Sequence, residues 1–229
     1  MNVVYEDNHI IVVNKAPGEI VQGDKTGDKP LVDIVREYIK EKYHKPGNVF
    51  CGVVHRLDRP VGGLVVFAKT SKALTRLNEM FREGRVNKTY WAISRNKPEP
   101  EEGRLTHFIT TVEKTKKSTA HSSPKPNAKE ARLSYRLIGQ SDRYNLIEVK
   151  LETGRKHQIR VQLSAIGCPI RGDLKYGDKR SNPDGSISLM ARSIEFEHPV
   201  SHQLISLTAP VPAGDILWEA MEKISHNEE

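Results

Sequence analysis

Residues 152–160 read Glu152-Thr153-Gly154-Arg155-Lys156-His157-Gln158-Ile159-Arg160 and connect a predicted strand to a predicted helix. The strand is expected over 144–151, and the helix over 156–166 with its apolar stripe facing inward. Gly167 and Pro169 are typical of a helix end. Because free backbone N–H groups gather at a helix start, Arg155, Lys156 and His157 there predict an anion-binding site.

Strands and helices are interspersed along the rest of the chain without regular alternation. Strands are expected over 3–5, 9–14, 63–69, 86–93, 131–138, 187–196 and 204–208. Helices are expected over 30–45, between a cap at Ser71 and a stop at Gly84, and over 214–225. This order favours an α+β fold with a mixed, mostly antiparallel central sheet and flanking helices and loops. Residues 114–130 have almost no apolar content, which predicts a mobile loop.

The charge distribution indicates a polyanionic partner. The 229-residue chain has a net charge of +7, and residues 104–136 carry eight basic and two acidic residues. Residues 150–180 carry eight basic and three acidic residues, whereas the last fifteen residues are acidic. Nucleic acid is the natural partner of such a field. A solvated basic surface that aids solubility would look the same, so charge alone does not decide between them.

Several classes of protein are disfavoured by the composition. No apolar run approaches the roughly 20 residues of a membrane-spanning helix, and the first residues lack the order of a signal peptide. Cys51 and Cys168 are far apart and have no paired-ligand spacing, which argues against a disulfide framework and a structural zinc site. We therefore expect a cytoplasmic protein without a metal, folded as one domain over 1–229, either undivided or as two lobes around a central cleft.

A second segment, His55-Arg56-Leu57-Asp58-Arg59-Pro60-Val61-Gly62-Gly63, is expected to form a tight loop before the strand at 63–69. Arginines on both sides of Asp58 favour its ionised form, and an ionised carboxylate can act as a nucleophile or a base. Arg56 and Arg59 could also grip phosphates. The alternative is an Arg–Asp pair in a surface turn, which is the usual meaning of such a pattern.

Two further segments carry candidate binding groups. In the strand at 86–93, Lys88 and Tyr90 face the same side, so the Tyr90 ring could stack on a nucleic-acid base, although a core tyrosine is the commoner case. Residues 167–177 predict a rigid loop that carries the cations Arg171 and Lys175.

Together these motifs resemble the RluA-type family of pseudouridine synthases over nearly the whole chain. The resemblance rests on 4–18, on His55-Arg56-Leu57-Asp58, on Lys88-Thr89-Tyr90, and on 153–160 with 169–177. Val61-Gly62 stands where the family commonly has Thr-Ser, and Ala16-Pro17 reverses the usual Pro-Ala order. Because the resemblance begins near residue 3, we expect no separate N-terminal RNA-binding module of the kind that some members carry.

The resemblance implies the pseudouridine synthase fold, with an active-site cleft across the sheet, and isomerisation of uridine to pseudouridine in ribosomal or transfer RNA. It implies no cofactor, in agreement with the lack of a dinucleotide, phosphate-loop or metal signature in the sequence. The target base would be flipped out of its stack. Asp58 would attack the sugar or base or remove a sugar proton, Tyr90 would stack on uracil, and Arg160 would pair with Asp58. We expect a monomer.

The same resemblance predicts the surroundings of the site. The Asp58 carboxylate is expected within about 4 Å of the Arg160 guanidinium, with the Tyr90 ring beside them. Leu189 would cover the other face of the flipped uracil, and Arg56 would fill the vacated space or hold the flipped phosphate. The rim of the cleft is expected to consist of Arg56, Arg59, Arg155, Lys156 and Lys175.

Two other functions remain open. One is a non-catalytic RNA-binding protein that retains the fold, in which Asp58, Tyr90 and Arg160 would have no reason to occur together. The other is a ribonuclease that uses His55 or His157 with Asp58 as acid and base. The sequence places no two histidines together, which disfavours the ribonuclease.

Overall fold

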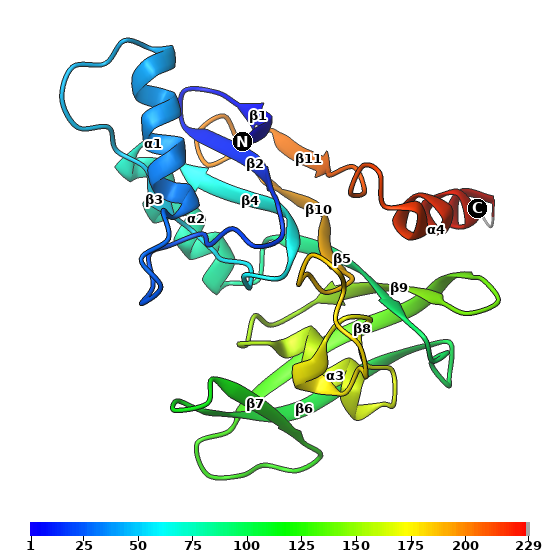
Figure 1. Cartoon of the computed structure of the whole chain (residues 1–229). Helices are drawn as coiled ribbons and strands as arrows, with labels where there is room; N and C mark the ends of the chain where they lie inside the picture. Colours follow the sequence, from blue (N-terminus) through cyan, green and yellow to red (C-terminus); the bar gives the residue numbers. More distant parts are fainter. Residues whose placement is uncertain (228–229) are drawn as a thin grey trace. The chain divides into compact units, whose positions relative to one another are not determined.

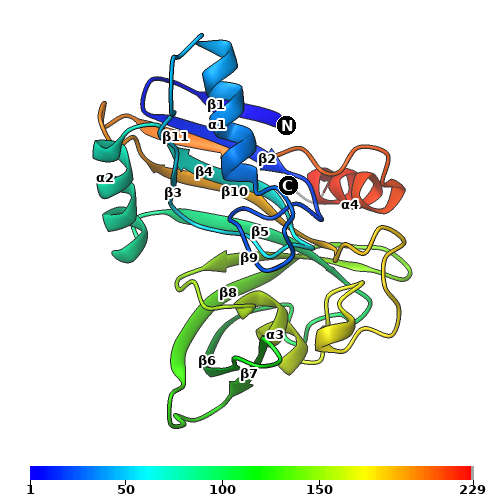
Figure 2. The same ribbon diagram turned by 60° about the vertical axis from the view of Figure 1, so that its left-hand side comes forward.

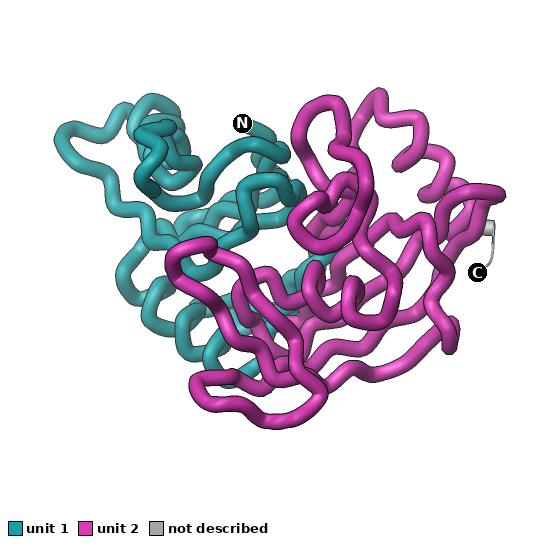
Figure 3. The backbone as a smooth tube through the Cα atoms, turned by 60° about the horizontal axis from the view of Figure 1, so that its bottom comes forward, with its two compact units in different colours: residues 1–86, 193–209 teal, residues 87–192, 210–229 magenta. Residues whose placement is uncertain are grey.

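The backbone of the computed structural model, described for residues 1–227, divides into two units (Figure 3). Unit 1 comprises residues 1–86 and 193–209, and unit 2 comprises residues 87–192 and the segment from 210 onward. Strand β10 (Leu189–Glu197) begins in unit 2 and continues into unit 1. Within residues 1–227, none of the helices is both long and apolar enough to cross a lipid bilayer.

The sheet of unit 1 is built on the apolar runs near the N-terminus. Strands β1 (Asn2–Glu6), β2 (Ile10–Lys15) and β4 (Gly62–Ala68) pair antiparallel in that order (Figure 1). The short β3 (Gly52–Val53) pairs with β4, and β11 (Leu204–Thr208) pairs antiparallel with β10. Every residue of β4 is buried, which is why its sequence is a continuous apolar run and not an alternating one.

Two helices accompany this sheet, α1 (Leu31–Lys42) and α2 (Ser71–Arg82) (Figure 2). The expected helix at 30–45 is confirmed. The expected cap of α2 was wrong by one residue, because Thr70 Oγ1 accepts the hydrogen bond from the Ala73 N–H at 3.2 Å. A Cβ atom at Gly52 would lie 2.8 Å from Leu74 of α2, so glycine at this position allows the helix to approach β3 closely.

A single carboxylate ties β1, α1 and the residue after β4 together. Glu6 accepts hydrogen bonds from Lys42 and Lys69, both at 2.7 Å, from Tyr38 at 3.1 Å and from Tyr43 at 2.8 Å. Burial acts to raise the pKa of Glu6, but these donors outweigh it and lower the pKa from 4.5 to about 2. The carboxylate is therefore far more stable as an anion in the folded chain.

This pKa predicts how stability depends on acid. Between pH 4.5 and 2 the unfolded chain binds a proton at Glu6 that the folded chain does not, so the free energy of unfolding falls as the pH drops through this range. The shift corresponds to about 3 kcal/mol. Glu6→Gln should flatten this fall in urea unfolding measured from pH 5 to 2.5, whereas Glu79→Gln on the exposed side of α2 should keep it. Equal pH profiles for the two variants would contradict the assignment.

Unit 2 is an antiparallel sheet in the order β5 (Asn87–Ser94), β9 (Asn145–Leu151), β8 (Lys129–Gln140), β6 (Glu102–Val112) and β7 (Lys117–His121). Helix α3 (Gln158–Ala165) and the 3-10 turn η1 (Leu174–Tyr176) pack on β6 and β8 through a cluster of Ile109, Ala131, Val161 and Tyr176. The closing helix α4 (Ile216–Asn227) packs on β8, where Ile224 lies close to Gly139. The expected α+β class with a mostly antiparallel sheet is confirmed.

The expected loop over 114–130 was wrong in part. Residues 117–121 form β7, which pairs with β6, and β8 already begins at Lys129. Ser118 is buried between exposed Lys117 and Thr119; its N–H donates to Tyr176 Oη at 2.9 Å and its hydroxyl to the Lys156 carbonyl at 2.9 Å. Polar contacts of one small residue therefore replace the apolar side chains that usually mark a strand.

Candidate active site

Asp58 lies on a short loop of unit 1 between β3 and β4. The Val61 N–H donates to the Asp58 carbonyl at 3.0 Å, and the Gly18 N–H donates to the Arg59 carbonyl at 2.8 Å. Leu57 is buried beneath the loop, Asp58 is half-buried and Arg56 is exposed. The loop therefore presents the carboxylate on a backbone that is fixed on both sides, as a catalytic group requires.

A buried lysine fixes the same loop from below. The Lys15 side chain is 1% exposed, and its Nζ donates to the carbonyls of Val61 at 2.7 Å, Ala16 at 3.0 Å and Arg59 at 3.2 Å. Burial lowers the pKa of Lys15 to about 8, while the carboxylates of Glu19 and Asp58 act in the opposite direction. Lys15 thus positions the Asp58 loop and interacts electrostatically with its carboxylate. This role of Lys15 was not predicted from the sequence.

The His55 side chain has a structural role in unit 1. Its Nε2 accepts a hydrogen bond from the Val66 N–H at 3.0 Å, and its ring stacks on Phe81 with 4.7 Å between centroids. Because the Nε2 lone pair is occupied by a backbone donor, it is not available to accept a proton from a substrate. This contact weighs against the ribonuclease alternative.

Arg59 contacts an acidic loop before α1. Its guanidinium donates to Asp28 at 2.6 Å, to Thr26 Oγ1 at 2.8 Å and to Asp24 at 3.3 Å. The hydrogen bond that Arg59 donates to the Asp28 carboxylate is the main reason why the pKa of Arg59 is raised. Contact of Arg59 with RNA stays a prediction, and it would require the phosphate to compete with these carboxylates.

The central feature of unit 2 is a buried ion pair. Arg160 donates from Nε to Asp173 Oδ2 at 2.7 Å and from a terminal nitrogen to Oδ1 at 2.9 Å. The two side chains are 7% and 1% exposed, and the guanidinium lies over the Tyr176 ring at 5.0 Å. This bidentate contact fixes the plane of the guanidinium. Asp173 lies in the 167–177 motif, but the sequence does not indicate that it is the partner of Arg160.

The predicted anion site at the helix start has a different geometry from the expected one. Helix α3 begins at Gln158 and not at 156, because His157 adopts a left-handed conformation with φ 56°. The His157 ring makes a 2.6 Å hydrogen bond between its Nδ1 and Tyr176 Oη. Burial raises the pKa of Tyr176. Tyr176 therefore joins His157, Arg160 and Ser118 into one connected group.

The other predicted residues of unit 2 occupy several elements. Tyr90 is buried in β5 opposite Val149, and Leu189 is buried at the start of β10. Lys175 donates to the carbonyls of Thr115 and Lys116 at 3.1 and 2.9 Å, which anchors the turn between β6 and β7.

The two cations at the α3 start differ from each other. Arg155 donates to the Glu130 carbonyl at 2.8 Å, whereas the Lys156 side chain is exposed. Arg56, Asp58 and Arg59 share one loop in unit 1, and His157 and Arg160 meet at Tyr176 in unit 2. The contact between Asp58 and Arg160 joins residues of different units and stays a prediction.

Similarity to known proteins agrees with these motifs. Residues 9–165 match the family described as RNA pseudouridylate synthase. The chain belongs to the RNA pseudouridylate synthase family. This confirms the family expected from the four motifs, and the match covers the Asp58 loop, Tyr90 and Arg160.

Named relatives of this family act on different RNAs. The chain is 30% identical to tRNA pseudouridine synthase C of Pectobacterium carotovorum subsp. carotovorum, over 96% of this chain and 61% of the relative. It is 33% identical to ribosomal large subunit pseudouridine synthase D of Yersinia pestis, over 96% and 66%. It is 30% identical to tRNA pseudouridine synthase C of Vibrio parahaemolyticus, over 96% and 93%. The chain thus spans less than two thirds of the first two relatives.

Solved structures of family members share the fold. Human RNA pseudouridylate synthase domain containing 4 superposes with a TM-score of 0.79 at 24% identity, covering 97% of this chain and 93% of that one. Human RNA pseudouridylate synthase domain containing 1 superposes with a TM-score of 0.69 at 22% identity, covering 96% of this chain and 94% of that one. The pseudouridine synthase fold expected from the sequence is confirmed.

Proposed function

We propose that this chain isomerises uridine to pseudouridine in RNA, with Asp58 as the essential carboxylate. The observation that carries the proposal is the Asp58 loop, which the buried Lys15 holds at the carbonyls of Arg59 and Val61, in a chain of the pseudouridylate synthase family. A loop this firmly fixed keeps one carboxylate ready for a flipped nucleotide. The backbone hydrogen bonds at the Asp58 and Arg59 carbonyls also help to fix this loop.

The reaction is an isomerisation, so its atoms balance without a co-reactant. The bond between the sugar carbon and N1 of uracil breaks, and a new bond forms from the sugar to carbon 5. The proton on carbon 5 is lost, and N1 gains one. Asp58 acts on the nucleotide by attacking the sugar or base, or by removing a sugar proton. Tyr90 stacks on the uracil in this proposal, and Leu189 covers its other face.

Arg160 is the proposed partner of Asp58 in the RNA-bound enzyme. Once RNA excludes water, the Asp58 charge needs a cation, and a guanidinium supplies aligned hydrogen bonds. The bidentate contact with Asp173 supports this role, because it holds the Arg160 guanidinium in a fixed orientation. Arg56, Arg59, Arg155, Lys156, His157 and Lys175 are the proposed phosphate contacts.

The substrate is proposed to be transfer RNA or ribosomal RNA, the two classes in the relatives' names. We further propose a monomer that works in the cytoplasm. Both cysteines, Cys51 and Cys168, are free thiols in buried positions, which is compatible with a reducing compartment.

The activity can be measured by release of tritium. Uridine RNA labelled with tritium at carbon 5 should lose its label to water when incubated with the protein, because that proton leaves during isomerisation. The release should continue after exhaustive dialysis against a chelator, since no step requires a metal or nucleotide. Strand scission without release would favour a ribonuclease, and neither event would favour a non-catalytic binder. A requirement for an added metal would contradict the cofactor-free mechanism.

RNA affinity should fall steeply with salt, because cationic side chains displace condensed counterions. Lys116, Lys117 and Lys125 are exposed on the 114–130 segment, where Lys116 pairs with Glu113. Reversing these three charges should reduce the slope of log affinity against log salt by about two to three. Filter binding at several salt concentrations measures the slope. An unchanged slope would mean that this segment does not contact RNA.

A further inference from the structure

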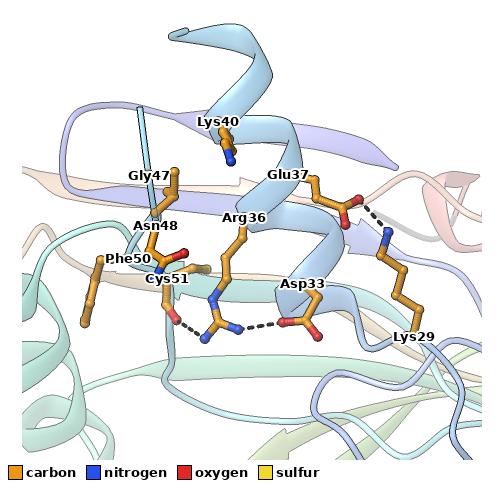
Figure 4. Close-up of a pocket in the computed structure, with 10 residues that line it drawn as sticks. Lys29, Asp33, Arg36, Glu37, Lys40, Gly47, Asn48, Phe50 and Cys51 are labelled. Carbon is orange, nitrogen blue, oxygen red and sulfur yellow. Dashed lines mark hydrogen bonds and ion pairs between the residues drawn. The ribbon is translucent and has the colours of Figure 1, made fainter. Parts of the chain in front are cut away.

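A pocket of about 760 Å³ lies in unit 1 between α1 and residues 47–51. Figure 4 shows the helix as one wall and the extended segment as the other, with Arg36 reaching between them. None of the lining residues belongs to the Asp58 loop. Its volume falls within the range of small-ligand sites. The proposed chemistry does not use this pocket.

The charged side chains that line the pocket have a net positive charge. Arg36 binds the Asp33 carboxylate at 2.5 Å and the Cys51 carbonyl at 3.2 Å, which ties the two walls together. Lys29 neutralises the second carboxylate, that of Glu37, at 2.5 Å (Figure 4). Among residues 1–227, the Lys40 ammonium has no hydrogen-bond or ion-pair partner, and it is exposed. The pocket can therefore accept a negative group at Lys40.

The wall opposite α1 carries groups that suit a nucleic-acid base. The Phe50 side chain is 45% exposed, which is unusual for a large apolar ring. In the described part of the chain, the Asn48 amide makes no hydrogen bond, and no backbone N–H of residues 47–50 donates to a carbonyl. A flat ring beside unused polar donors and acceptors matches the way proteins hold unpaired bases.

We propose that this pocket binds an unpaired nucleotide of the substrate RNA, distinct from the uridine that reacts. Phe50 stacks on the base, Asn48 and the adjacent backbone contact its edge, and Lys40 contacts a phosphate. The inference rests on the proposed function in that the ligand is RNA. RNA is favoured over an acidic protein segment because the pocket combines a stacking surface with amide groups as well as a cation.

An oligonucleotide without uridine separates this site from the reaction. Fluorescein-labelled octa-adenylate cannot be isomerised, and fluorescence anisotropy at low salt measures its binding. Phe50→Ala should raise the Kd roughly tenfold, within the usual effect of losing one stacked base. Lys40→Glu should also weaken binding and lower the salt slope by about one. Leu204→Ala and Lys72→Glu, which change an exposed apolar residue and an exposed lysine elsewhere in unit 1, serve as matched controls.

Each result decides the proposal. Weaker binding by the two pocket variants, with Leu204→Ala and Lys72→Glu unchanged, would support it. Unchanged binding by Phe50→Ala would overturn it and leave the pocket to a protein partner. An equal loss in the controls would also overturn it, because binding would then follow the general surface. Tritium release by the wild-type chain is scored separately, so the loss of either finding leaves the other interpretable.

Discussion

Asp58→Asn should abolish tritium release from uridine RNA while leaving the fold and the affinity for RNA nearly intact. The amide keeps the shape of the carboxylate but removes the charge that the chemistry needs, whichever of the three routes Asp58 follows. A single-turnover assay should show a loss of more than about a thousandfold, as expected for removal of a group that acts on the reacting atoms. Filter binding and thermal unfolding report the retained affinity and fold.

The surroundings of Asp58 make this variant a clean test. The loop is held by backbone groups, namely the Asp58, Arg59 and Val61 carbonyls, and the Asn side chain leaves all of these contacts in place. Asp142→Asn is the matched control, because Asp142 is an exposed carboxylate in the turn between β8 and β9. Turnover should be normal in this control. Retained turnover in Asp58→Asn would refute the assignment of the catalytic carboxylate.

Elements whose burial shows in a local sequence pattern were predicted, and elements that depend on contacts with distant segments were not. Strand β4 was predicted because all its residues are buried, which gives a continuous apolar run in the sequence. Helix α1 was predicted because burial of one helix face gives apolar residues a local period. Strand β6 was missed because its residues alternate between exposed and half-buried, and the cover on its inner face comes from α3. Strand β7 was missed because buried Ser118 is held by hydrogen bonds and not by apolar packing.

The same distinction applies to the candidate site. Asp58 and the α3 start were found because their motifs are contiguous, so the residue types and their order are visible. The role of Lys15 depends on carbonyls that are more than 40 residues away in the sequence. These carbonyls come within hydrogen-bond distance of Lys15 only in the folded chain. The Asp173 partner of Arg160 was missed for a different reason. The guanidinium was assigned to Asp58 on chemical grounds, whereas Nε and one terminal nitrogen of Arg160 donate to the Asp173 carboxylate.

Asp173→Asn should destabilise the chain by about 3–5 kcal/mol, the usual cost of removing one partner from a buried ion pair. Both side chains are almost fully buried, so the substitution removes a buried negative charge that faces the Arg160 guanidinium at 2.7 Å. The Tyr176 ring at 5.0 Å offers a cation–π contact, which is too weak to replace the lost pair. Urea unfolding at pH 7 measures the loss. Asp184→Asn, on an exposed turn, provides a comparison and should change little.

A second variant separates the burial of charge from the packing of the site. Arg160→Met with Asp173→Leu removes both charges and keeps apolar volume, so the double variant should be more stable than Asp173→Asn alone. If Arg160 pairs with Asp58 in the RNA-bound enzyme, the double variant should remain folded yet lose turnover, because it has no guanidinium at this position. A double variant that unfolds as readily as Asp173→Asn would show that geometry, and not uncompensated charge, limits stability here. Normal turnover in a folded double variant would remove Arg160 from the proposed active site.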